Sequence, residues 1–343
     1  MKPNAGPGDS ALETPSPSPG ATRFARVRAR LERFQPPPGP ASWAYEFLLF
    51  GFKQGWACLF GGLMLALLLG THLFYPPDAP LARYDFLTLS AVAIQIGMIA
   101  FRLESWREVK VIAVFHVVGT VMELFKTSAG SWAYPEGGVL HIGAVPLFSG
   151  FMYAAVGSYI ARIWRIFDIR FTQYPPRWAT VALAVAIYVN FFAHHWLPDI
   201  RLALFAATAL LFGRTRFYFT PFRTARWMPA LLGFLLVALF IWFAENIGTF
   251  AHAWTYPDQR DGWQMVSLAK LGSWYLLMII SVVLVSLVHP PRPTMPPARL
   301  NPRRADATRA PAPRRAHRAP SARRDRRAWR RDRRPIRAAA ASR

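Results

Sequence analysis

The chain lacks several features that would place it in a familiar class. Its 343 residues include one cysteine, Cys58, so no intrachain disulfide can form. Neither His-Glu-x-x-His nor Cys-x-x-Cys occurs, and we therefore expect no metal ion and no other cofactor. A phosphate-cradling glycine-rich loop, a serine nucleophile elbow and an aspartate pair suited to magnesium diphosphate are also missing. No apolar segment of a secretory signal occurs in residues 1–22, so the first apolar run is expected to direct insertion.

Acidic residues are scarce, at 18 against 41 lysines and arginines, and the excess lies at the ends of the chain. Residues 291–343 hold 18 arginines and 3 aspartates, whereas residues 36–290 hold 17 basic and 12 acidic side chains. We expect no specific nucleic-acid partner for the folded part. The ends are predicted to be a basic leader (1–40), with an interfacial helix at 23–34 or no fold at all, and a disordered cytoplasmic tail (291–343). Both could contact anionic lipid head groups, or the tail could be solvated without a specific ligand.

Apolar runs dominate residues 41–290 and predict an all-α membrane domain in the lipid bilayer. Arginine and lysine are denser in the loops after the second, fourth and sixth runs, which predicts a bacterial inner (plasma) membrane protein with both termini in the cytoplasm. Gly51 and Gly55 form a small-xxx-small pair, which indicates close helix packing within the fold or in a homodimer. Eight transmembrane helices are expected, at 47–72, 86–101, 109–125, 139–163, 178–196, 200–213, 227–247 and 267–288.

Two segments 122 residues apart carry nearly the same motif. The first (123–135) reads Glu-Leu-Phe-Lys-Thr-Ser-Ala-Gly-Ser-Trp-Ala-Tyr-Pro, and the second (245–257) reads Glu-Asn-Ile-Gly-Thr-Phe-Ala-His-Ala-Trp-Thr-Tyr-Pro. The same register aligns Tyr153 with Tyr275. This internal repeat, with units around 109–163 and 227–288, predicts two parallel four-helix halves related by a pseudo-two-fold axis.

The two motifs supply the candidate site. A carboxylate inside an apolar span is costly unless it faces a polar interior, so Glu123 and Glu245 are the leading catalytic candidates. His116 shares a helix face with Glu123, and Lys270 lies at a comparable depth, where it could pair with a glutamate. The alternative is that each glutamate pins its loop by accepting hydrogen bonds from the motif's tryptophan and tyrosine. The expected substrate-binding residues are Thr127, Trp132, Tyr134, Asn246, Thr249, Trp254 and Tyr256.

Residues 43–290 resemble the YoaT-like family of bacterial integral membrane proteins, a domain of unknown function (817). The resemblance lies in the Trp43-Ala-Tyr-Glu-Phe segment, in both motifs and in Val145-Pro-Leu-Phe-Ser-Gly-Phe-Met-Tyr153. It implies a membrane protein and no particular activity. The first motif, with Gly143-Ala-Val-Pro-Leu after it, is also similar to the acidic motif of membrane carotenoid hydratases and cyclases. That similarity implies that the two glutamates protonate a double bond while aromatic rings steady the carbocation.

Three functions remain open at this point. The first is an enzyme that uses Glu123 and Glu245 on an isoprenoid or another lipid-soluble substrate. The second is a proton- or cation-coupled transporter with its site at the repeat interface. The third is a non-catalytic scaffold whose motifs only seal helix ends. Because the glutamates are expected near the outer boundary rather than at the midplane, the first and third are favoured over the transporter.

Overall fold

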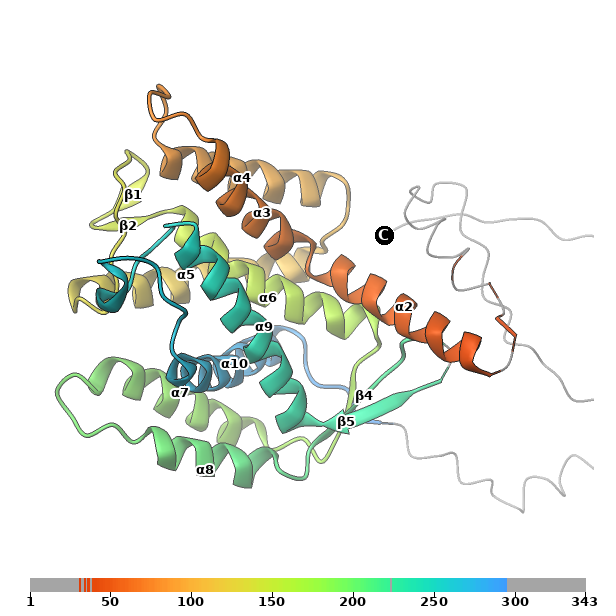
Figure 1. Cartoon of the computed structure of the whole chain (residues 1–343). Coiled ribbons are helices and arrows are strands. Elements are labelled where there is room, and N and C mark those ends of the chain that lie inside the picture. The colour runs from red at the N-terminus through yellow and green to blue at the C-terminus, as the bar shows by residue number, and fades with distance from the viewer. Residues whose placement is uncertain (1–30, 32–33, 35, 38, 223, 295–343) are drawn as a thin grey trace, which may run out of the picture. The chain divides into compact units, whose positions relative to one another are not determined.

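The computed structural model is mostly helical (Figure 1). It describes residues 31, 34, 36–37, 39–222 and 224–294. The predicted helix at 23–34, apart from residues 31 and 34, and the tail beyond 294 therefore lie outside the described residues. Within them the helices are α2 (Pro40–Ala57), α3 (Leu59–Phe74), α4 (Arg83–Ala100), α5 (Trp106–Ser128), α6 (Phe148–Ile166), α7 (Arg177–Ala193), α8 (Arg201–Phe212), α9 (Ala230–Phe250), the short 3-10 turn η1 (Pro257–Gln259) and α10 (Leu268–Val288).

A helix occurs in each of the eight predicted regions, but the first region is not one straight helix. The helices α2 and α3 meet at a bend of 70°. Gly55, Gly61 and Gly62 lie within a few residues of this break, where their low helix propensity makes an interruption cheap. The prediction of a single helix over 47–72 is therefore wrong.

Length and composition support fewer membrane crossings than the eight expected. In the described part of the chain, α9 and α10 are each long and apolar enough to cross a membrane, and α2 with α3 would make a third crossing. The helices α7 and α8 are apolar but shorter. The count of eight is not confirmed.

Two small antiparallel sheets were not predicted. The hairpin of β1 (His141–Ile142) and β2 (Val145–Pro146) occupies the region where the fourth span was expected to begin, so that span starts at Phe148 rather than at 139. Gly143 makes the turn with a φ of 58°, a conformation that favours glycine. The second sheet joins β3 (Arg170–Thr172), β4 (Arg216–Phe219) and β5 (Arg226–Pro229) in that order, and it moves the start of α9 from 227 to 230.

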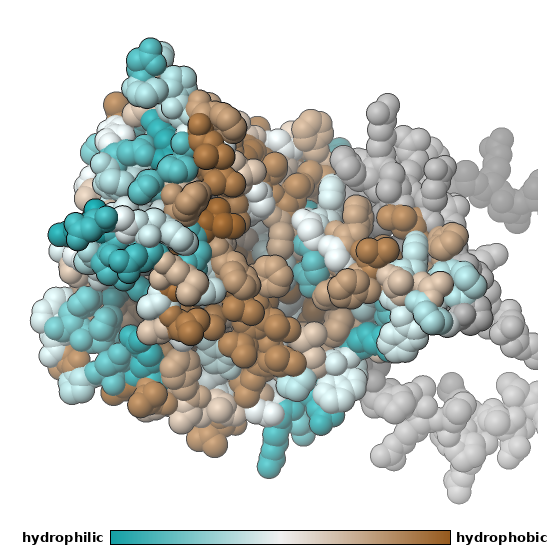
Figure 2. Space-filling view, in the orientation of Figure 1, coloured by the Kyte–Doolittle hydropathy of each residue, from teal (hydrophilic) through white to brown (hydrophobic). Residues whose placement is uncertain are grey.

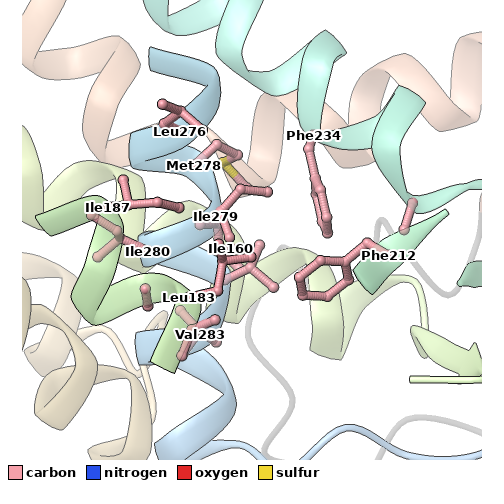
Figure 3. Close-up of a cluster of buried hydrophobic side chains, with 14 of the residues drawn as sticks. Ile160, Leu183, Ile187, Phe212, Phe234, Leu276, Met278, Ile279, Ile280 and Val283 are labelled. Carbon is pink, nitrogen blue, oxygen red and sulfur yellow. The ribbon is translucent and has the colours of Figure 1, made fainter. Parts of the chain in front are cut away.

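The largest buried cluster surrounds α10, which contacts α5, α6, α7, α8 and α9. Because lipid tails are as apolar as leucine, such helices are held by close packing rather than by exclusion of water. The tightest pair is α5 with α6, where a methyl group added at Gly119 would lie 2.5 Å from the Tyr153 ring. Figure 3 shows the packed side chains of this cluster, among them Ile160, Leu183, Ile187, Phe212, Phe234 and Ile279.

Large apolar side chains also cover the outside of the molecule. Phe47 and Phe240 are each 73% exposed, and Leu202 and Leu210 are exposed further. Figure 2 shows hydrophobic residues across the middle of one face, with hydrophilic residues gathered at its left edge. An exposed apolar surface of this kind, together with the long apolar helices, identifies a membrane protein.

Candidate functional site

The two motifs meet at equivalent positions. The backbone N–H of Ala133 donates to the carbonyl of Thr255 at 3.0 Å, and the N–H of Thr255 donates back at 2.9 Å. These residues are the variable positions of the two Trp-x-Tyr-Pro segments, 122 residues apart. The antiparallel bridge therefore places the first motif loop directly against the second.

Glu123 is a buried acceptor surrounded by aromatic donors. Its Oε2 accepts from the indole Nε1 of Trp132 at 2.8 Å and from the hydroxyl of Tyr134 at 2.7 Å. Its Oε1 accepts from the hydroxyl of Tyr153 at 2.6 Å. Burial, reinforced by the Glu123 charge, raises the pKa of Tyr134 well above its usual range, so this hydroxyl keeps its proton and donates it. Both oxygens of the Glu123 side chain thus accept hydrogen bonds.

Glu245 repeats part of this arrangement. It accepts from the hydroxyl of Tyr256, at the position equivalent to Tyr134, and from the Nε1 of Trp274 at 2.5 Å. Tyr275, the equivalent of Tyr153, forms no hydrogen bond to any residue placed in the structure and instead lies against the Phe205 ring. The glutamate–tyrosine pair is therefore shared by both motifs, whereas the remaining donors differ.

Both glutamates line one cavity of about 920 Å³. Its walls are largely apolar and come from α2, α3, α6, α9 and α10, with Phe47, Met64 and Phe240 among the lining side chains. The volume is at the upper end of the range of about 300–1,000 Å³ usual for small-molecule sites. Seven of the residues predicted for the site line this cavity: Glu123, Glu245, Lys270, Trp132, Tyr134, Trp254 and Tyr256.

Four other predicted residues are not part of the cavity wall. His116 lies against the Phe151 ring, at a centroid distance of 4.8 Å, and beside Gly150. The hydroxyl of Thr127 donates to its own helix, at the carbonyl of Glu123. Asn246 accepts from the N–H of Val266 at 2.9 Å, and Thr249 accepts from the indole of Trp263 at 3.1 Å. The latter two side chains brace the loop that follows α9.

Sequence reasoning missed two cations that line the same cavity, Lys126 and Arg201. Lys126 lies three residues after Glu123 on α5, so helical spacing could have placed it near the site. Arg201 begins α8, and nothing in its sequence neighbourhood connects it to either motif. In the described segments, no cluster of three or more His, Cys, Asp or Glu residues could hold a metal ion.

The glycine pair in α2 has a different role from the expected helix contact. A methyl group added at Gly51 or at Gly55 would meet no atom within 4 Å among the residues that the model places. Both glycines line the cavity instead. The prediction of close packing at this pair within the fold is therefore wrong, because the space beside both glycines belongs to the cavity and not to a neighbouring helix.

Comparison with known proteins places the chain in a family. Residues 46–282 match the family described as "Protein of unknown function (DUF817)". The chain is 43% identical over 241 residues to "Uncharacterized protein YoaT" of Bacillus subtilis (strain 168), an alignment that covers 70% of this chain and 90% of the relative. The chain therefore belongs to the DUF817 family.

Two crystal structures show a limited similarity of fold. One is the mycobacterial Insig homolog MvINS from Mycobacterium vanbaalenii, with 16% sequence identity and a TM-score of 0.41. The other is a cross-linked trimer of MvINS, with 15% identity and the same TM-score. Each alignment covers 56% of this chain and 98% of the other.

Proposed function

We propose that this member of the DUF817 family binds a long, lipid-soluble molecule in the cavity between α2, α3, α6, α9 and α10. The observation that carries the proposal is the cavity itself, about 920 Å³ in volume, with largely apolar walls and few charged side chains. A site of this form suits a molecule with an extended hydrocarbon part. An isoprenoid is one such molecule.

In this proposal Glu123 and Glu245 are positioning residues. The oxygens of each carboxylate accept hydrogen bonds from aromatic N–H and O–H donors of the protein, so these oxygens already have partners inside the fold. Glu123 thus holds the Trp132 and Tyr134 rings of its motif loop at the cavity wall, and Glu245 holds the Tyr256 ring of the other loop. This arrangement supports the pinning role over acid catalysis.

We further propose that the helix pairs α5–α6 and α9–α10 are equivalent halves of an internal repeat. The bridge between Ala133 and Thr255 supports this, because an antiparallel pair of equivalent residues has a local two-fold axis between its strands. The arginine-rich loops support an inner-membrane protein with both termini in the cytoplasm.

Filling the cavity tests the proposal. Gly55→Leu places a side chain in open space at the cavity wall, and Gly97→Leu places the same side chain in open space on α4, away from the cavity. Oleyl alcohol should bind the wild type and Gly97→Leu equally, and Gly55→Leu at least about tenfold more weakly. Native mass spectrometry of the proteins in detergent measures this. Equal binding by both variants would refute a ligand in this cavity.

The enzyme alternative has its own test. Membrane lipids and pigments are extracted from cells that carry the wild-type gene, the deletion, or Glu123→Gln with Glu245→Gln. The double variant must first be shown to fold and to bind oleyl alcohol. If a lipid then changes to the same extent in the deletion and in the double variant, the glutamates take part in a reaction. If the lipid changes only when binding is lost, the glutamates position the site and do not react.

A further inference from the structure

A buried lysine without an ionic partner lies at the cavity. Lys126, in the last turn of α5, is 3% exposed and is part of the cavity wall. Its ammonium contacts the Nε2 of His195 at 3.1 Å and faces the Phe191 ring at 4.4 Å. Neither partner is an anion. Within the described ranges Lys126 forms no ion pair, and a buried ammonium is costly without one.

Lys270 is a second cation of the same kind. It stands in the first turn of α10, with its ammonium 3.9 Å from the centroid of the Tyr256 ring and 5.7 Å from that of Trp132. Glu245 attracts it electrostatically, but the oxygens of Glu245 accept from Tyr256 and Trp274. In the part of the chain that the structure places, Lys270 makes no salt bridge either. Its N–H donors are therefore available to a molecule in the cavity.

The cations of the site are close to one another. Lys126, Lys270 and Arg201 all line the cavity, and each is near enough to repel the other two electrostatically. Arg201 is paired with Asp199 at 3.1 Å and is partly exposed, whereas Lys126 is buried and Lys270 is half-buried. Asp199 attracts Lys126, and Glu245 and Asp258 attract Lys270, but in the described residues none of these carboxylates forms a salt bridge with either lysine. The ammonium groups therefore lack a direct anionic partner, which a bound anion would supply.

The two lysines have no counterpart in the other half of the internal repeat. In its register Glu123 matches Glu245 and Tyr134 matches Tyr256, whereas Lys126 matches Gly248 and Lys270 matches Phe148. The hydrogen bond between the glutamate and the tyrosine is made in both motifs. The lysines occur once each, so they distinguish the two halves of the repeat at the cavity.

We infer that the ligand is an anionic amphiphile, in which Lys126 and Lys270 bind a carboxylate or phosphate head group and the apolar walls hold its hydrocarbon chain. This inference rests on the proposed function and narrows it from any lipid-soluble molecule to an acidic one. The glycines of α2 and α3 leave the room for the chain.

The test compares ligands with one hydrocarbon chain and different head groups. Oleyl alcohol, oleate and oleyl phosphate are titrated into the purified full chain in neutral detergent, and inorganic phosphate is titrated alone. The wild type should bind oleate and oleyl phosphate at least about tenfold more tightly than the alcohol, the range expected for hydrogen bonds to a charged group. Lys126→Gln with Lys270→Gln should remove this preference, and Lys126→Arg with Lys270→Arg should restore it.

Two controls separate the possible failures. Lys110→Gln, on an exposed part of α5, removes one charge away from the cavity and should change nothing. Gly55→Leu should weaken binding of all three oleyl compounds. If the alcohol binds as tightly as the anions, the head-group inference fails while the proposed cavity function stands. If no oleyl compound binds, the proposed function fails. If inorganic phosphate competes as well as oleyl phosphate does, the site binds a free anion and the inference of an amphiphile fails.

Discussion

Ala133 and Thr255 exchange two backbone hydrogen bonds, 3.0 and 2.9 Å long, across 122 residues of sequence. This bridge sets one motif loop beside the other, so that the Trp132 and Tyr256 rings meet edge to face at a centroid distance of 6.2 Å. Lys270 lies over both rings. Both motifs therefore contribute to the cavity wall on this side. A substitution of one glutamate should also change the position of the other motif loop.

Glu123→Gln should destabilise the fold. The amide replaces one accepting oxygen with an N–H₂ group that faces the donors Trp132, Tyr134 or Tyr153, and the loss of a hydrogen bond to a charged group costs about 2–3 kcal/mol. The free energy of unfolding in detergent measures the effect. Asp78→Asn, at an exposed position, is the matched control and should unfold like the wild type. Equal stability of the two variants would contradict the pinning role of Glu123.

Tyr153 and Tyr275 occupy equivalent positions of the repeat, so the stabilities of Tyr153→Phe and Tyr275→Phe can be compared. Tyr153 donates to Glu123 at 2.6 Å, whereas the hydroxyl of Tyr275 makes no hydrogen bond with the residues that the structure describes. Removing the first hydroxyl should cost about 1–2 kcal/mol of unfolding free energy, and removing the second should cost little. Thermal unfolding of the two purified variants measures both losses of stability. Similar losses would show that the two halves of the repeat do not differ as described.

Gly119→Ala should disturb the packing of α5 against α6. The new methyl group would lie 2.5 Å from the Tyr153 ring, so that ring or the helices must move, at a cost of about 1–3 kcal/mol. Gly97→Ala is the control, because its methyl group meets open space and should stabilise α4 by about 0.5–1 kcal/mol through helix propensity. The two unfolding midpoints should therefore move in opposite directions. A higher unfolding midpoint for both variants would show that α5 and α6 are farther apart than described above.

His195 predicts a pH dependence of stability. Burial, together with the neighbouring Lys126 and His194, lowers the pKa of His195 below its ordinary 6.5. A lowered pKa means that the folded state prefers the neutral ring, which can accept from Lys126. The stabilisation is present above pH 6.5 and is lost as the pH falls through the lowered pKa. Between about pH 7.5 and about pH 5, the wild type should therefore lose more thermal stability than His195→Asn. Identical losses would contradict this role.

The helical regions and the two glutamate motifs could be predicted because each depends on residues near one another in sequence. Apolar runs marked the helices, and the exact spacing of Glu, Trp and Tyr marked both motif loops. The bend between α2 and α3 was missed because apolar residues lie on both sides of Cys58 and no proline marks the break. The sheet of β3, β4 and β5 was missed because its strands are short and pair over long separations, which local patterns do not record.

The sequence by itself determined that this is a helical membrane protein with two acidic motifs in the same register, because hydropathy and spacing are properties of the chain read in order. Only the tertiary structure shows which side chains those acids meet. Tyr153 and Trp274 reach the carboxylates from other helices, and Lys126 and Arg201 share a cavity although 75 positions separate them. Such contacts arise from how the helices bend and pack, since side chains far apart in sequence become neighbours only when the whole fold has formed.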